Sequence, residues 1–311
     1  HVLHSQTDIH KDYGGVVPEL ASRDHIRKIS PLTKLILANN QKKLTDLQGI
    51  AYTSGPGLMG ALLIGATFAK TLAQVKKIPF VAVNHLEGHA LAVRLVNDIK
   101  FPYLVLLISG GHSNFYFLKN TNKYDFIGGT LDDAVGEAFD KVGKVLGLKF
   151  PGGPEVEKKA LEGDENAFVF PKPLLRTVHT DLNLSFSGLK SHVIKLVNSN
   201  KNNLLSKSFI EDISASFQKT VSDILVNKLK RAVKYCNEKF ESYDSVVVTG
   251  GVASNSYLRK KFIETIIKSN KKPFIPPANL CTDNGAMIAW AGYERFKLGY
   301  SDNLNFKAMP R

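Results

Sequence analysis

The stretch PYLVLLISGGHSNFYFLKN, residues 102–120, decides the fold class. Two runs of aliphatic and aromatic residues flank Gly110–Gly111, a pattern typical of two strands joined by a glycine turn. A strand that ends in glycines recurs in LQGIAYTSGPG (47–57) and in DSVVVTGGVASNSYLRKKF (244–262), where a helix follows the glycines. Short β-rich runs therefore alternate with amphipathic helical runs, and this alternation predicts an α/β protein.

The other segments continue this alternation. The pattern predicts helices at 60–77, 85–96 and 131–148, a buried strand at 79–85, a long helical region at 206–239, and strand, polar loop and helix within 272–296. The stretch KFPGGPE (149–155) is rich in glycine and proline, so we expect a loop that ends the preceding helix. We draw a domain boundary near residue 100.

The composition favours a polyanionic partner such as nucleic acid. The 311 residues include 41 Lys and Arg against 28 Asp and Glu, which gives a net charge of +13. A lysine-rich surface that binds no such partner would also give a positive net charge. No run approaches eighteen consecutive apolar residues, so we expect no membrane span. The two cysteines, Cys236 and Cys281, fit a reducing cytoplasm better than a disulfide scaffold.

A pair of histidines in NHLEGHAL (84–91) raises the question of a metal site. His85 and His89 are four residues apart and would share one face of a helix, so their imidazoles could bind one ion. Two packing histidines are the alternative, because the spacing alone is a weak signal. Asp283, at the start of a later helix, would complete a three-ligand site with an open position, although it could also be a simple N-cap.

The three glycine turns point to a nucleotide. Glycines let backbone N–H groups approach an anion closely, and a helix N-terminus adds a favourable field. None of the turns matches the dinucleotide fingerprint or the Walker lysine loop, and the nearest architecture is the actin-like ATPase. Asp140 interrupts an apolar helical stripe, so it is either a ligand-binding carboxylate or a solvated residue. Cys281 is interpreted as a packing residue.

Several motifs together closely resemble the TsaD family of tRNA threonylcarbamoyladenosine transferases, in its bacterial and organellar branch. They are YGGVVPELASRDH, SGPGLMGALLIGA, NHLEGH, LLISGGHS, DDAVGEAFDKVGKVLGLKFPGGP, SFSGLK, TGGVASNSYLR and CTDNGAMIAWAG. The resemblance implies an actin-like ATPase (ASKHA) fold with two related α/β lobes around a ligand cleft. It implies lobes at 1–100 and 101–311, with the last helix (about 283–298) packing back on the first. Measured against the family, both ends of the chain look clipped, and the first strands of the N-terminal lobe are expected to be missing.

The resemblance also assigns roles residue by residue. It makes His85, His89 and Asp283 the ligands of one divalent ion, iron or zinc. It places the co-substrate threonylcarbamoyl-AMP against a set of residues from the glycine turns and their helices: Leu107, Ile108, Ser109, Gly110, Gly111, Asp140, Gly153 and Asn255. A carboxylate can accept hydrogen bonds from ribose hydroxyls, so Asp140 is expected to bind the ribose. Backbone N–H groups from Ser109 onward could stabilise charge on the carbonyl oxygen, and His112 is the candidate base.

The implied activity is transfer of the threonylcarbamoyl group to the exocyclic amine of adenosine 37 in tRNAs that read codons starting with A. Besides tRNA, the implied partners are a degenerate paralogue (TsaB-like) and a small ATPase (TsaE-like). One alternative is a metal-dependent protease, but a zincin has Glu directly after the first His and here Leu86 holds that position. The other alternative is a non-catalytic nucleotide-binding scaffold, which would not need an open metal site.

Overall fold

The computed structural model describes the chain except residues 11–12, 14–15, 177, 179–180, 201–205, 241 and 311. The described residues form two compact units. Unit 1 comprises His1–Asn97 together with Asp283–Arg311, and unit 2 comprises Asp98–Thr282. Within the described part of the chain, no helix is both long and apolar enough to span a membrane.

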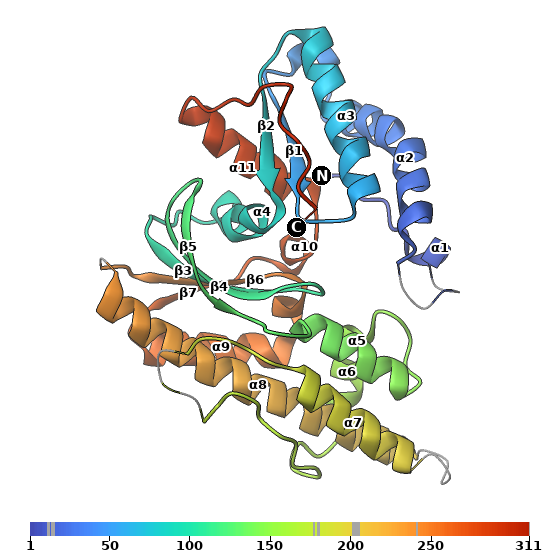
Figure 1. Cartoon of the computed structure of the whole chain (residues 1–311), viewed down its shortest axis with the longest axis vertical. Coiled ribbons are helices and arrows are strands. Elements are labelled where there is room, and N and C mark those ends of the chain that lie inside the picture. Colours follow the sequence, from blue (N-terminus) through green and yellow to red (C-terminus); the bar gives the residue numbers. More distant parts are fainter. Residues whose placement is uncertain are drawn as a thin grey trace. The chain divides into compact units, whose positions relative to one another are not determined.

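Unit 1 is built on a two-stranded parallel sheet, β1 and β2, with helices around it (Figure 1). Its elements are α1 (Thr7–His10), α2 (Pro18–Asn39), the 3-10 helix η2 (Leu44–Asp46), β1 (Ile50–Gly55), α3 (Met59–Lys76), β2 (Phe80–Asn84), α4 (His85–Ala92), the 3-10 helix η3 (Val93–Leu95) and α11 (Gly285–Lys297). The chain passes from β2 into α4 without an intervening loop, so the end of the strand fixes where α4 begins.

Both faces of β1 are covered, because successive residues of a strand point to opposite sides of the sheet. Tyr52 packs with three alanines of α3, Ala66, Ala69 and Ala73. The preceding residue, Ala51, faces α11. A Cβ added to Gly292 of that helix would lie 2.4 Å from the Cβ of Ala51. Small residues thus let both helices approach the strands closely.

Unit 2 contains a five-stranded sheet in the order β5-β4-β3-β6-β7, with helices packed on it. Its elements are β3 (Tyr103–Ile108), β4 (Ser113–Asn120), β5 (Lys123–Gly129), α5 (Val135–Val145), α6 (Gly152–Ala160), α7 (Ser187–Ser199), α8 (Lys207–Lys239), β6 (Ser245–Thr249), the 3-10 helix η4 (Gly251–Ser254), α9 (Ser256–Lys268), β7 (Lys272–Phe274) and α10 (Ala278–Cys281). β3 and β4 form an antiparallel hairpin, and β3, β6 and β7 run parallel.

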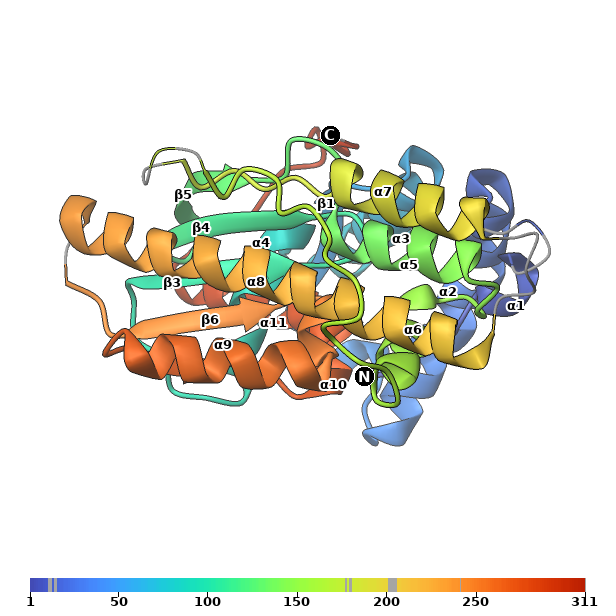
Figure 2. The ribbon, with the colours of Figure 1, turned by 90° about the horizontal axis from the view of Figure 1, so that it is seen from below.

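The main core lies between one face of this sheet and the helices. Phe117 of β4, Phe217 of α8 and Phe262 of α9 are all fully buried there. Figure 2 shows α8 and α9 running across one face of the sheet, with α7 lying next to α5. The strands β3 and β6 are parallel neighbours, and each is followed by a glycine turn. The Ser109–Gly111 turn and the Gly250–Gly251 turn therefore lie side by side at the edge of the core.

The predicted α/β class and the predicted strands at 79–85 and within 102–120 are confirmed. The expectation of a loop at 149–155 is wrong, because α6 begins at Gly152. The reason is tertiary: the Gly152 N–H donates to the Asp140 carboxylate at 2.8 Å, and an added Cβ would lie 2.8 Å from the Asp140 Cα. The longer elements α2, β5 and α7, and the short helices α1 and η2, also lie outside the predicted set.

Candidate functional site

His85 and His89 lie on the first turns of α4, at the end of β2. Asn84 is the N-cap of this helix, and its side-chain oxygen accepts from the N–H of Leu86 at 2.8 Å. The two imidazole rings are 4.8 Å apart, with an interplanar angle of 88°. The predicted i, i+4 pair therefore does share one face of a helix.

Asp283 meets both histidines. Its Oδ1 lies 3.3 Å from Nε2 of His85 and 2.9 Å from Nε2 of His89. The alternative role of Asp283 as an N-cap is wrong, because the side chain of Asn284 caps α11 by accepting from the Met287 N–H at 2.9 Å. The carboxylate is therefore directed at the two rings.

The group has the chemistry of a metal site. One ligand atom from each of His85, His89 and Asp283 lies within 4.8 Å of the others, so the three could hold a metal ion. The His89 side chain is only 1% exposed, whereas that of Asp283 is 76% exposed, which leaves one side of the group open. Crowding by protein atoms would raise the pKa of Asp283, but the bonds to both imidazoles outweigh it and hold that pKa well below its usual range.

Unit 2 contains a cavity of about 260 Å³ at the ends of β3 and β6. It is lined by glycine turns, helix starts and a few polar side chains: Gly110, Gly136, Phe139, Asp140, Pro151, Gly153, Pro154, Glu157, Gly251, Val252, Ser254, Asn255 and Thr282. Four of the residues predicted from the sequence to contact the adenylate line this one volume: Gly110, Asp140, Gly153 and Asn255.

The Ser109–Gly111 turn has a defined backbone. The Ser109 N–H donates to the His112 carbonyl at 2.7 Å, and the His112 N–H donates to the Ser109 hydroxyl oxygen at 3.1 Å. Gly110 and Gly111 are exposed, and a Cβ on either would meet nothing within 4 Å. Leu107 and Ile108, by contrast, have fully buried side chains in β3, so only their backbone could reach a ligand.

Asp140 lies on α5 at the wall of the cavity. Burial raises the pKa of its carboxyl group, an effect that the backbone N–H groups of Gly152 and Gly153 partly offset. The carboxylate therefore lines the cavity and also forms the contact that holds the start of α6. The reading of Asp140 as a solvated residue does not fit this position.

Asn255 also lines the cavity, but its side-chain amide is engaged within the protein. Its oxygen accepts from the Leu258 N–H at 2.9 Å as the N-cap of α9, and its nitrogen donates to Gln218 at 2.7 Å. Sequence reasoning missed Glu157, which lines the same cavity and accepts from the Ser256 N–H at 2.7 Å. Had α6 been recognised, the i, i+4 spacing from Gly153 would have placed Glu157 on the cavity face.

A model of the TsaD family, described as tRNA N6-adenosine threonylcarbamoyltransferase, matches residues 1–290. A relative with that description from Rickettsia massiliae (strain Mtu5) is 45% identical over 307 residues, which cover 98% of this chain and 88% of the relative. Another from Wolbachia pipientis wMel is 45% identical over 311 residues, with coverage of 100% and 90%. The chain belongs to the TsaD family.

Solved structures agree on the fold. Full-length HypF in its phosphate- and nucleotide-bound form superposes with a TM-score of 0.58 at 14% identity, covering 81% of this chain and 39% of that one. HypF of T. kodakarensis gives a TM-score of 0.53 at 15% identity, with coverage of 83% and 42%. The expected family and the expected fold, α/β of the actin-like ATPase class, are confirmed. Since the family is one of transferases, the protease and scaffold alternatives are set aside.

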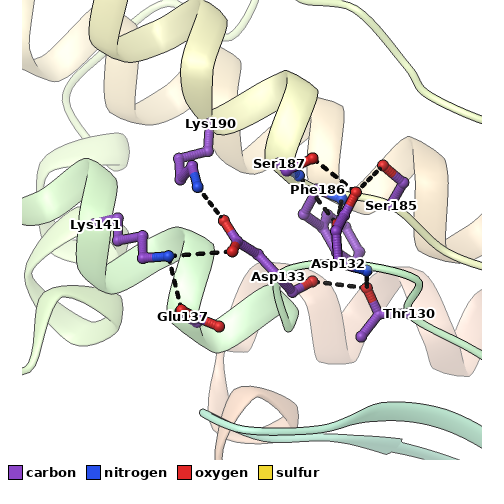
Figure 3. A network of polar contacts seen from close by, with 9 residues as sticks. All are labelled: Thr130, Asp132, Asp133, Glu137, Lys141, Ser185, Phe186, Ser187 and Lys190. Atoms are coloured by element: carbon purple, nitrogen blue, oxygen red, sulfur yellow. Dashed lines mark hydrogen bonds and ion pairs between the residues drawn. The ribbon is translucent and has the colours of Figure 1, made fainter.

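Two motifs that carry the TsaD resemblance, DDAVGEAFDK and SFSGLK, meet in a polar network (Figure 3). The Asp132 carboxylate accepts from the hydroxyl groups of Ser185 and Ser187 at 2.6 and 2.7 Å. It also accepts from the backbone N–H of Phe186 and of Ser187 at 2.9 and 3.2 Å, at the start of α7. The neighbouring Asp133 pairs with Lys141 and Lys190 at 3.1 and 2.5 Å.

This network holds the start of α5 next to the Ser109–Gly111 turn. The Gly136 N–H donates to the Ser109 carbonyl at 3.2 Å, and a Cβ at position 136 would lie 2.6 Å from that oxygen. The first turn of α5 therefore contacts the turn that forms part of the cavity. In this TsaD-family chain the Asp132 and Asp133 contacts stabilise the frame of the cavity from outside it.

Asp132→Asn should reduce stability in a pH-dependent way. Burial opposes ionisation of Asp132, but the four donated hydrogen bonds outweigh it and lower its pKa in the folded state. The stabilisation is therefore present above the unfolded pKa, about 3.9, and is lost as pH falls through the lower folded pKa. Because Asp132 is exposed and solvent screens its contacts, we expect the variant to lose only about 1–2 kcal/mol of unfolding free energy at pH 7.

Urea unfolding of wild type and Asp132→Asn between pH 7 and pH 3 measures the difference in their unfolding free energies. This difference should become smaller below about pH 5. Asp125→Asn is the matched control, because Asp125 makes an exposed ion pair with Lys119 and should contribute no more than about 0.5 kcal/mol. Equal stability of the Asp132 variant at pH 7, or a difference that widens in acid, would contradict the prediction.

Proposed function

We propose that the chain transfers the threonylcarbamoyl group from threonylcarbamoyl-AMP to the exocyclic amine of adenosine 37 in tRNAs that read codons starting with A, with release of AMP. The observation that carries the proposal is the cavity of unit 2, in a chain of the TsaD family. There an open glycine backbone and a partly buried carboxylate, two features suited to a nucleotide, face one volume.

The cavity offers separate contacts for the parts of an adenylate. The exposed backbone at Gly110–Gly111 presents N–H groups to a phosphate or an acyl oxygen, next to the start of α5. Asp140 can accept hydrogen bonds from ribose hydroxyls, as backbone amides cannot. Gly153, beside Asp140, has no side chain to block that approach.

The chemistry needs little beyond orientation and polarisation, because an adenylate is a good leaving group. The adenosine amine attacks the carbonyl carbon, a C–N bond forms, and the bond from that carbon to the phosphate oxygen breaks. The backbone N–H groups of Gly110 and Gly111 stabilise the negative charge on the carbonyl oxygen, because the N–H of Ser109 is already donated to the His112 carbonyl. We assign His112, directly after the turn, to accept the proton released by the amine.

His85, His89 and Asp283 are proposed to hold one divalent ion, iron or zinc. Two imidazole nitrogens and a carboxylate suit either ion, and three protein ligands leave a coordination position for another group. Such an ion, when bound, supplies Lewis acidity toward an oxygen ligand. The residues themselves fix where that ligand can approach, because His89 is buried and the Asp283 side of the group is open.

The proposed partners are tRNA and two proteins. The net charge of +13 suits tRNA phosphates, which position an RNA without reading its sequence. The target base must leave its stack to reach a cavity. A degenerate paralogue (TsaB-like) and a small ATPase (TsaE-like) are proposed as protein partners, in the cytoplasm where the tRNA substrate occurs.

The direct test is to incubate the protein with threonylcarbamoyl-AMP and unmodified tRNA and to measure the modified nucleoside by mass spectrometry. We expect threonylcarbamoyladenosine at position 37 and one AMP for each transfer. A tRNA with guanosine at that position is the matched control. Absence of product, with or without the two proposed partner proteins, would refute the function.

His85→Ala should remove the metal. Loss of a ligand should weaken Zn²⁺ affinity by more than the roughly 10–100-fold that follows loss of an outer contact. His192→Ala is the control, because it makes the same chemical change at an exposed position of α7. Metal content after dialysis and titration with a competing chelator give the affinity, and full occupancy in His85→Ala would refute the ligand assignment.

Asp140→Asn should weaken the binding of the adenylate. The variant keeps an oxygen for the Gly152 N–H but loses the charged acceptor, and a hydrogen bond to a charged group contributes about 1.5–3 kcal/mol. We therefore expect AMP or adenylate affinity to fall about 10–150-fold, while metal content stays unchanged.

Glu137→Gln is the control for this variant, since Glu137 lies one turn earlier on α5 and pairs with Lys141 instead of lining the cavity. Calorimetric titration with a non-reactive adenylate analogue gives the affinity, and single-turnover transfer gives the rate. Wild-type affinity with a reduced rate would show that Asp140 acts on the chemical step and not on the ribose.

A further inference from the structure

The metal-site helix α4 carries a buried carboxylate that faces away from the two histidines. Glu87 is two residues from both His85 and His89, which is about 200° around a helix of 3.6 residues per turn. Its side chain is only 1% exposed. It is therefore neither a ligand of the same ion nor a base for a metalloprotease. A buried carboxylate needs a compensating partner.

The partner of Glu87 is Arg295, on α11. The guanidinium Nε donates to Glu87 Oε1 at 3.2 Å, and Nη2 donates to Oε2, so the pair is bidentate. The third nitrogen, Nη1, donates to the Ala82 carbonyl of β2 at 2.8 Å. Arg295 is 12% exposed, and it joins three elements through one rigid planar group.

All three candidate ligands lie within or next to these elements. β2 ends one residue before His85, α4 contains both histidines, and α11 begins two residues after Asp283. The helices α4 and α11 also pack closely, since a Cβ at Gly88 would lie 2.8 Å from Ile288 Cδ1. The separation and rotation of α4 against α11 therefore determine how Asp283 meets the two imidazoles.

A second ion pair joins the same region of unit 1. Arg94 of η3 donates through Nε to Glu294 of α11 at 2.7 Å, and the Glu294 side chain is 8% exposed. This pair also joins a guanidinium to a largely buried carboxylate, but Arg94 lies in η3, beyond the end of the helix that contains both histidines. It thus provides an internal control that separates stabilisation of the unit from positioning of the ligands.

We propose that Glu87 and Arg295 are positioning residues of the metal centre, holding the histidine face of α4 at the orientation in which Asp283 and both imidazoles bind one transition-metal ion. This inference rests on the metal centre put forward under the proposed function. Loss of the bidentate contact lets α4 rotate or slide against α11, so the three ligands no longer converge. A role in stability alone would leave the coordination geometry unchanged.

The test is titration of the full chain with Co²⁺ and Zn²⁺ in wild type, Glu87→Gln, Arg295→Lys and Glu294→Gln. We expect about 10–100-fold weaker binding of both ions in Glu87→Gln and in Arg295→Lys. The visible absorption of the bound Co²⁺ should shift in position and intensity in these two variants, because it reports coordination geometry. In Glu294→Gln the affinity should stay within about threefold of wild type and the spectrum should be unchanged.

Arg295→Lys makes the test decisive even if Glu87→Gln does not fold, because lysine keeps the charge but loses the planar fork. A wild-type affinity and spectrum in either folded variant would overturn the positioning role. An equal loss of metal affinity in Glu294→Gln would also overturn the positioning role, since it would show that reduced stability of the unit weakens metal binding in general. Wild-type protein that binds neither ion would instead refute the metal centre itself, and the positioning role with it.

Discussion

The arrangement of unit 2 depends on a close backbone approach at the ends of two parallel strands. Gly250 follows β6 with a φ of +96°, and an added Cβ would lie 2.3 Å from the carbonyl oxygen of Ile108 at the end of β3. Only glycine adopts that conformation in that space. Because of this contact the two glycine turns end side by side, and the helices that follow them frame one cavity.

The sequence predicts those parts of the molecule that local pattern determines. The strand 79–85, the hairpin within 102–120 and the helix at 206–239 each have a strong period or a turn signal, and all three are confirmed. The start of α6 follows instead from a contact between Gly152 and Asp140, twelve residues apart. Periodicity cannot report such a contact, and the prolines and glycines alone favour a loop.

The candidate site divides in the same way. The i, i+4 spacing predicts that His85 and His89 share a helix face. Asp283 lies 194 residues from His89 in the chain, and its place at the start of a later helix predicts an N-cap as readily as a third ligand. The contact between Glu87 and Arg295 spans 208 residues, and no local pattern marks Arg295 among other basic residues at a helix end. Long-range polar pairs of this kind need a structure to be found.

Three asparagines serve the structure as helix caps, which limits what their side chains can offer a ligand. Asn84, Asn255 and Asn284 each cap a helix by accepting a backbone N–H from within its first turn. Asn255, in addition, donates one of its two amide N–H groups to the buried Gln218, so that group is already engaged within the protein.

Asp140 differs from Asn255, because burial raises its pKa and the amides of Gly152 and Gly153 compensate this only in part. A hydroxyl donor that enters the cavity would add the missing compensation. We therefore expect the carboxylate to contribute more to ligand binding than the amide of Asn255, whose oxygen and one of whose two N–H groups are already bonded within the protein.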